Sequence, residues 1–215
     1  MTLVAFDFDG TLSDSEMTVL LGKQCGVADQ MDEITEQAMN NEIAYAESLR
    51  KRCALLDGLP EAKAQAAFDQ VELRPGTAEL IDTLDKAGVY TSILTGGFER
   101  GVESALEKEG VSVETLIANR LPVVDGKLTG EVEGPLIEGT KDDALDVLTT
   151  VVGESMHDTV AVGDGANDLP MLEAAGLAIG FSPKPAVEPS CDVVVESMPE
   201  LLDALEAEGI LGDQS

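Results

Sequence analysis

Short runs of apolar residues alternate with amphipathic stretches along most of the chain. The apolar runs are expected to form buried strands and lie at residues 3–8, 89–94, 159–163, 177–181 and 192–195. The stretches between them carry helical periodicity at residues 77–87, 98–109, 141–152, 168–174 and 199–208. This alternation predicts an α/β fold, a Rossmann-like, doubly wound and mostly parallel sheet with helices on both faces. Such sheets bind ligands at the carboxyl ends of their strands.

One long segment interrupts the alternation directly after the first strand. Residues 14–73 contain no convincing strand and are rich in Ala, Glu, Gln and Met, and Pro75-Gly76 precedes the return to alternation. We therefore expect a small helical cap domain at 14–73, which acts as a lid over a core of residues 1–13 and 74–215. Asp125-Gly126 stands between two β-prone runs and predicts a hairpin.

The charge balance excludes several classes of partner. The 215 residues include 42 Asp and Glu against 13 Lys and Arg, a formal net charge of −29. Nucleic acid requires a basic surface and an anionic membrane repels an acidic protein, so we expect neither as a partner. Because 44% of the residues are hydrophobic, the chain can fill a folded core. The carboxylates favour a halophile cytoplasm, whose salt screens self-repulsion, with an ordinary acidic mesophile protein as the alternative.

Targeting signals and cysteine spacing both favour the cytoplasm. No run reaches the roughly 18 to 20 apolar residues of a membrane span, and Asp7 comes too early for a secretory signal. The three cysteines lack CxxC spacing and His157 is the only histidine, which argues against a disulfide framework or a zinc site. We therefore expect reduced thiols.

Two acidic clusters follow strands that we expect to be neighbours in the sheet. Asp7 and Asp9 stand at the end of the first strand, and Asp164 and Asp168 follow the strand at 159–163. Carboxylates this close repel each other unless a cation lies between them, and oxygen ligands of this kind suit Mg²⁺. The plainer interpretations are a solvated pair in a turn and, for Asp168, an N-cap of the following helix.

A hydroxyl and a cation complete the candidate chemistry. Thr95-Gly96-Gly97 lies between a predicted strand and a predicted helix, where a hydroxyl and free N–H groups suit an anion such as phosphate. Lys141 opens another predicted helix. Taken alone, the first is also compatible with an ordinary turn and the second with a surface charge.

Together these four elements resemble the motifs of the haloacid dehalogenase-like phosphohydrolases, in order and across essentially the whole chain. The resemblance is carried by Asp7-Phe8-Asp9-Gly10-Thr11, Thr95-Gly96, Lys141 and Gly163-Asp164-Gly165-Ala166-Asn167-Asp168. It implies that Asp7 is a nucleophile that forms an aspartyl-phosphate. It also implies that Asp9 protonates the leaving oxygen and later accepts a proton from the attacking water.

The same resemblance implies a Mg²⁺ cofactor and a set of substrate contacts. The metal would be held by Asp7, Asp164 and the Asp9 carbonyl. Asp168 would orient Lys141 or a water on the metal. The substrate would be bound at its phosphate end by Thr95, Gly96 and Lys141. Asn167 would be a further substrate contact.

A finer resemblance, to the phosphoserine phosphatase family, extends through the expected cap. Glu16 stands at the position that receives the substrate ammonium, and Arg52 at the position that clamps its carboxylate. Met39 and Tyr45 match positions that enclose the substrate, and residues 118–120 and 126–134 are also similar. In two departures, Thr95 replaces the usual Ser, and Tyr45 replaces a Phe. The implied reaction is Mg²⁺-dependent hydrolysis of O-phospho-L-serine in serine biosynthesis.

Other functions remain open on the residues alone. The chain could hydrolyse another small phosphorylated metabolite, or transfer the phosphoryl group to an alcohol. A signalling receiver domain shares the acceptor Asp, the Thr and the Lys on a doubly wound sheet, but it is much shorter and has no cap. A degenerate binding protein is a further alternative. The oligomeric state is open between monomer and homodimer.

Overall fold

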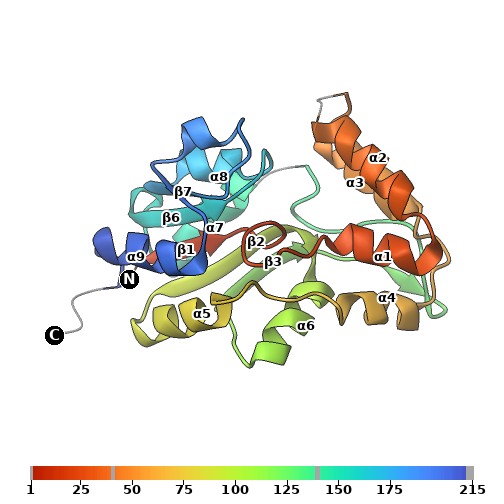
Figure 1. The fold of residues 1–215 in the computed structure, drawn as a ribbon, viewed down its shortest axis with the longest axis horizontal. Helices are drawn as coiled ribbons and strands as arrows, with labels where there is room; N and C mark the ends of the chain where they lie inside the picture. Colours follow the sequence, from red (N-terminus) through yellow and green to blue (C-terminus); the bar gives the residue numbers. More distant parts are fainter. Residues whose placement is uncertain (1, 40–41, 139–140, 212–215) are drawn as a thin grey trace.

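A parallel sheet of six strands forms the centre of the computed structural model, which describes residues 2–39, 42–138 and 141–211 (Figure 1). The strand order is β3-β2-β1-β6-β7-β8. The bounds are β1 (Leu3–Phe6), β2 (Tyr90–Phe98), β3 (Thr115–Asn119), β6 (Thr159–Gly163), β7 (Leu177–Phe181) and β8 (Val193–Val195). The chain moves from β1 to one edge and then returns to the other side of β1, which confirms the predicted doubly wound sheet.

Helices cover both faces of this sheet. All four residues of β1 are buried, as expected for a parallel strand that is covered on both sides. The helices on one face are α5 (Thr77–Lys86), α6 (Glu99–Glu109) and α9 (Met198–Ala207), and those on the other are α7 (Lys141–Val152) and α8 (Leu169–Ala174). Phe6 packs in the first layer and its neighbour Ala5 in the second. Within the described residues, each helix is too short or too polar to cross a membrane.

Two parts of the sheet differ from the prediction. Strand β2 continues to Phe98, four residues beyond the predicted end, and its pairing with β3 shifts register between Leu94 and Phe98. The edge strand β3 was not predicted, because four of its five residues are only half-buried and no continuous apolar run marks it. The remaining predicted strands and helices agree with the structure to within two residues at their ends.

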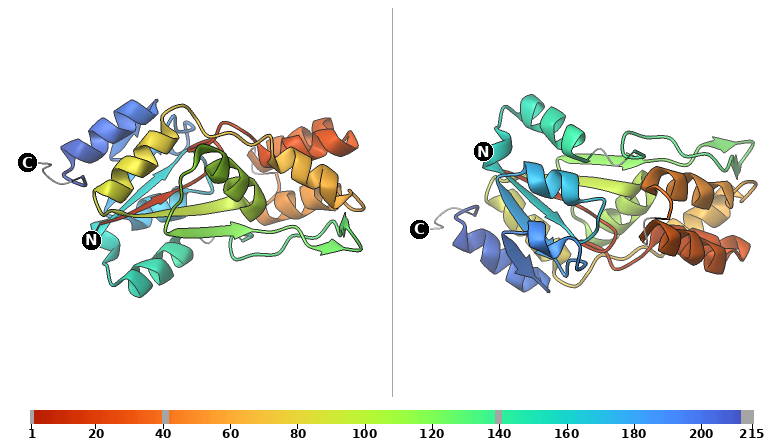
Figure 2. Two further views of the ribbon diagram at one scale, coloured as in Figure 1. Left: turned by 90° about the horizontal axis from the view of Figure 1, so that it is seen from below. Right: turned by 90° about the horizontal axis from the view of Figure 1, so that it is seen from above.

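Four helices follow β1 where the cap was expected. They are α1 (Met17–Cys25), α2 (Ala28–Met39), α3 (Tyr45–Ala54) and α4 (Glu61–Phe68). Figure 2 shows them together at the end of the sheet towards which the strands run. The two connections to the sheet lie side by side, since Ser13 bridges Leu73 and the Arg74 N–H donates to the Leu12 carbonyl at 2.8 Å.

The predicted hairpin is present and contacts the helical segment. Strands β4 (Val123–Val124) and β5 (Lys127–Leu128) flank Asp125 and Gly126, whose φ angles of 50° and 72° fit the tight turn that Asp-Gly favours. The Leu128 N–H donates to the Leu59 carbonyl, and the Leu128 carbonyl accepts from the Gly58 N–H, both at 2.9 Å. These bonds tie the hairpin to the chain between α3 and α4.

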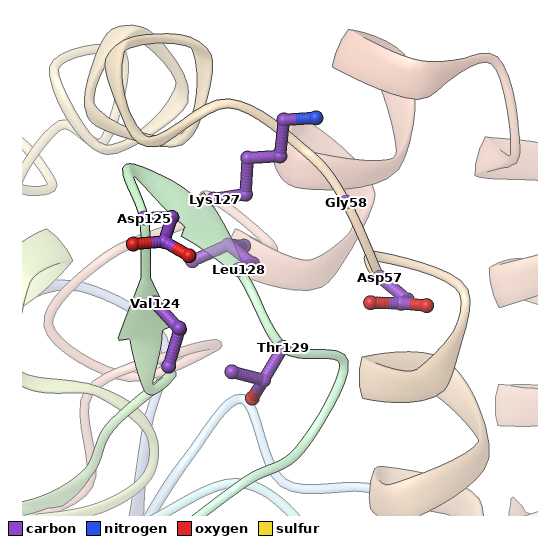
Figure 3. Close-up of a pocket in the computed structure, with 7 residues that line it drawn as sticks. All are labelled: Asp57, Gly58, Val124, Asp125, Lys127, Leu128 and Thr129. Atoms are coloured by element: carbon purple, nitrogen blue, oxygen red, sulfur yellow. The ribbon is translucent and has the colours of Figure 1, made fainter.

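A surface hollow of about 590 Å³ lies where the hairpin meets this chain segment (Figure 3). Asp57 stands on one side of it, and Val124 and Asp125 stand on the other. Its lining residues all lie outside the four motifs identified in the sequence. Residues of three of the four motifs line a separate cavity at the carboxyl ends of the strands.

Candidate active site

The two acidic clusters meet at the carboxyl ends of the adjacent strands β1 and β6. Asp7 follows β1 and its N–H donates to the Val162 carbonyl at 2.8 Å, while Asp164 follows β6. Gly10, with a φ of +93°, passes so close that a Cβ there would lie 2.7 Å from the Asp164 carboxylate. The glycine therefore lets the first loop pack against the second.

Lys141 joins these clusters from the first turn of α7. Its Nζ lies 2.5 Å from Asp7 Oδ1 and 2.6 Å from Asp168 Oδ1, and all three side chains are buried. The second oxygen of Asp168 accepts from the Asp164 and Gly165 N–H groups at 3.0 and 2.9 Å. Lys141 is therefore not a surface charge, and the Asp168 side chain holds the loop instead of capping α8.

This cluster carries more negative than positive charge. Carboxylate oxygens of Asp7, Asp164 and Asp168 lie within 4.8 Å of one another, against one buried ammonium. Burial and then the Asp168 charge raise the pKa of Asp7 to about 8, although Lys141 opposes the shift. Burial lowers the pKa of Lys141, but Asp168 and Asp7 outweigh it and the net shift is upward. The unbalanced charge and the hard oxygen donors fit a divalent cation such as Mg²⁺.

Asp9 lies beside this cluster with an unused oxygen. Its Oδ1 is buried and makes no hydrogen bond to the part of the chain that the structure describes. Burial first, and then the charges of Glu16 and Asp7, raise its pKa well above the usual range. A Cβ on Gly97 would lie 2.6 Å from Asp9 Oδ2, so the glycine makes room for the carboxylate. A carboxyl group held in this way can exchange a proton with a ligand.

The Thr95-Gly96-Gly97 segment differs from the expected helix N-terminus. It lies within the irregular last part of β2, and α6 begins only at Glu99. Thr95 is buried and its Oγ1 accepts from the Gly97 N–H at 2.9 Å. Asn119 Nδ2 donates to the Gly96 carbonyl at 3.0 Å. The segment is thus an ordered turn within the strand, supported from the edge strand β3.

Arg52 and Glu16 approach the same region from the helices. Arg52 is only 8% exposed, its Nη1 donates to Thr18 Oγ1 at 3.0 Å, and its buried Nε has no partner among the described residues. Its neighbours Arg50 and Lys51 instead form exposed ion pairs, so Arg52 alone of the three turns inward. Glu16 is exposed at the start of α1, and its side chain does not cap the helix.

A single cavity of about 670 Å³ brings the two groups of residues together. Its lining includes Asp7, Asp9, Glu16, Tyr45, Arg52, Thr95, Gly96, Asp164 and Asn167. Lys141 is buried behind Asp7 and does not line the cavity itself. The side chain of Met39, which the sequence also singled out, lies outside the described part of the chain.

Two residues at the site lie outside the four motifs, and the sequence assigned neither of them a role. Lys184 follows β7, and its Nζ lies 3.4 Å from Asp164 Oδ2. Asn119, at the end of β3, is fully buried between the Gly96 carbonyl and the Leu136 N–H. A Lys just after a predicted strand was the only signal for the first. The signal for the second was the family resemblance at residues 118–120, because the strand that positions Asn119 was not predicted.

Comparisons with known proteins agree with this arrangement. The family model of the haloacid dehalogenase-like hydrolases matches residues 4–173. A phosphoserine phosphatase of Halobacterium salinarum is 52% identical over 210 residues, covering 98% of this chain and 100% of the relative. A phosphoserine phosphatase of Methanocaldococcus jannaschii is 39% identical over 195 residues, covering 90% of this chain and 92% of the relative.

Solved structures show the same likeness. A phosphoserine phosphatase with a phospho-aspartyl intermediate analogue has a TM-score of 0.87 at 37% identity, covering 94% of this chain and 98% of that one. A substrate-bound phosphoserine phosphatase complex has a TM-score of 0.88 at 37% identity, covering 94% of this chain and 97% of that one.

Proposed function

Since the chain belongs to the haloacid dehalogenase-like hydrolases, we propose that it hydrolyses O-phospho-L-serine to L-serine and phosphate. The observation that carries the proposal is one cavity that presents both a nucleophile and a clamp for an amino acid. Asp7, held by Lys141, faces the same cavity as Arg52, whose Nε has no partner among the described residues. The likeness to phosphoserine phosphatases over 98% of the chain supports the proposal.

In this reaction Asp7 attacks phosphorus and forms an aspartyl-phosphate, which water then hydrolyses. Lys141 fixes the position of Asp7 and provides positive charge close to the phosphoryl group. Thr95 and the Gly96 N–H bind phosphoryl oxygens, and Asn167, which also lines the cavity, adds a polar contact. Asp168 acts through Lys141, because its carboxylate touches Lys141 and the loop.

Asp9 is the proposed general acid and base. Its raised pKa favours the protonated form relative to a free carboxyl group, so that it can protonate the serine oxygen as it leaves. The resulting carboxylate then accepts a proton from the water that attacks the aspartyl-phosphate. Its unpaired Oδ1 is free to make these contacts.

Mg²⁺ is the proposed cofactor, held by Asp7 and Asp164 together with the Asp9 carbonyl. The close carboxylates with their surplus negative charge support this assignment. When bound, the metal supplies positive charge that offsets the charge of the phosphate and of the attacking carboxylate.

The helical segment at 14–73 is the proposed cap, and it supplies the contacts to the amino-acid end. The Arg52 guanidinium is suited to the carboxylate of the substrate, and the exposed Glu16 is suited to its ammonium. Among the described residues Arg52 has no carboxylate partner. Burial of its charge in this way is costly unless a ligand supplies a carboxylate. The same proposal places the enzyme in serine biosynthesis in the cytoplasm.

A panel of phosphate esters tests the proposal. With Mg²⁺, purified protein is expected to hydrolyse O-phospho-L-serine with a kcat/KM well above that for O-phosphoethanolamine, which lacks the carboxylate, and glycerol phosphate, which lacks both charged groups. Equal values for the three esters would reject the assignment. Transfer of most of the phosphoryl group to an added alcohol would indicate a phosphotransferase instead.

A further inference from the structure

Tyr45 begins α3, yet its hydroxyl reaches the last part of β2. A Cβ on Gly96 would lie 1.9 Å from the Tyr45 hydroxyl oxygen and 3.1 Å from the ring carbon that carries it. Glycine at 96 is therefore what allows the phenol to approach. Tyr45 also lines the cavity that contains Asp7 and Thr95. A polar group of the helical segment thus lies at the proposed phosphate end of the site.

The Tyr45 hydroxyl is a hydrogen-bond donor that has no partner among the described residues. Within residues 2–39, 42–138 and 141–211, no hydrogen bond involves it. Burial raises the pKa of Tyr45 to about 12, so the hydroxyl carries its proton at neutral pH. A half-buried donor without a partner is costly, and a ligand that supplies an acceptor removes this cost.

We propose that the Tyr45 hydroxyl donates a hydrogen bond to a phosphoryl oxygen of the substrate. The chemistry of the ligand narrows the choice, because an ammonium offers only donors and cannot accept from the phenol. The carboxylate has Arg52 as its partner in the proposed function, on which this inference rests. The phosphoryl group offers several acceptors beside Thr95 and Gly96, where the hydroxyl lies.

This contact links the two ends of the substrate through one helix. Tyr45 and Arg52 are seven residues apart in α3, which places them two turns apart on the same helix face. One rigid element therefore contacts the phosphoryl group at its first turn and the carboxylate at its last turn. A ligand that carries both groups at the right separation engages both residues.

The test removes the hydroxyl and measures binding of each product. The chain has two tyrosines, and the second provides a matched control, because the Tyr90 hydroxyl contacts Thr115 Oγ1 at 2.6 Å at the start of β2. By calorimetry with Mg²⁺, Tyr45→Phe is expected to weaken binding of inorganic phosphate about tenfold, typical of a bond to a charged acceptor. L-serine binding is expected to stay unchanged, and Tyr90→Phe to leave both affinities unchanged.

Unchanged phosphate binding in Tyr45→Phe would overturn the inference, and so would an equal or larger loss of L-serine binding. A second measurement uses Tyr90→Phe protein labelled with 3-fluorotyrosine, in which Tyr45 gives the only ¹⁹F signal. Phosphate is expected to shift this signal more than L-serine does, and the reverse order contradicts the inference. Because phosphate binding needs no turnover of phosphoserine, failure of the ester panel would reject the proposed function without deciding this result.

Discussion

The ammonium of Lys141 lies 2.6 Å from Asp168 Oδ1, and both side chains are buried. The same Asp168 accepts two N–H groups of the loop that carries Asp164. One carboxylate therefore fixes both the cation beside Asp7 and the loop that supplies a proposed metal ligand. Removing it disturbs two parts of the site at once.

Asp168→Asn is expected to lower both stability and activity. Removing one partner of a buried ion pair lowers the free energy of unfolding by about 3–5 kcal/mol. Loss of a contact that supports a metal ligand lowers activity about 10- to 100-fold. Thermal unfolding and kcat/KM at saturating Mg²⁺ measure the two effects. Asp203→Asn removes the same charge from the exposed face of α9 and is expected to change neither. A fully stable and fully active Asp168→Asn protein would contradict the interpretation.

Asp9→Asn is expected to abolish turnover and to stabilise the metal-free protein at pH 7. The pKa of Asp9 is raised in the folded state, so ionisation penalises folding as pH rises above the unfolded value of about 3.9. The penalty is complete above the pKa of the folded state. It is absent below the pKa of the unfolded state, where Asp9 is protonated in both states. Asn cannot ionise, so we expect the free energy of unfolding at pH 7 to be higher for Asp9→Asn than for the unchanged protein.

Denaturant unfolding in EDTA at several pH values measures this gain. The difference between Asp9→Asn and the unchanged protein is expected to disappear as the pH falls towards 4. Asp14→Asn, at an exposed position in the same loop, provides the control. A gain that persists undiminished at low pH would show that ionisation of Asp9 is not its cause.

Mg²⁺ is expected to raise the melting temperature of the metal-free protein. A ligand at a hundredfold excess over its dissociation constant stabilises the folded state by about 2.7 kcal/mol. Asp164→Asn removes a proposed ligand and is expected to lose most of this increase, whereas Asp203→Asn is expected to retain it. An equal Mg²⁺ effect in both variants would place the metal elsewhere.

The sequence predicts the buried acidic cluster with Lys141 better than it predicts the residues that support this cluster. Asp7, Asp164 and Lys141 follow or open elements with strong periodicity, so the parallel sheet brings them together as expected. Asn119 and Lys184 are positioned by tertiary contacts that carry no local pattern. The edge strand β3 was not predicted because its half-buried positions weaken the apolar signal in the sequence.

Arg52→Lys is expected to raise KM for phosphoserine about tenfold or more while leaving the protein folded. Lysine keeps the charge but cannot form the two parallel hydrogen bonds that a guanidinium donates to a carboxylate. KM for O-phosphoethanolamine, which lacks that carboxylate, is expected to change little. Arg50→Lys is the matched control, because Arg50 lies two residues before Arg52 and forms an exposed ion pair with Glu138. Equal losses for both esters would mean that Arg52 acts on the fold.

Molar KCl is expected to raise the melting temperature. With 42 acidic and 13 basic residues, repulsion among carboxylates exceeds the attraction in exposed pairs such as Arg120–Glu133. The screening length falls from about 10 Å at 0.1 M salt to about 3 Å at 1 M, so most of the increase is expected below about 1 M. Sucrose stabilises folded proteins without screening charges, so it is expected not to reproduce this dependence of the melting temperature on KCl concentration. A melting temperature that falls with KCl would instead indicate an ordinary acidic mesophile protein, stabilised by its ion pairs.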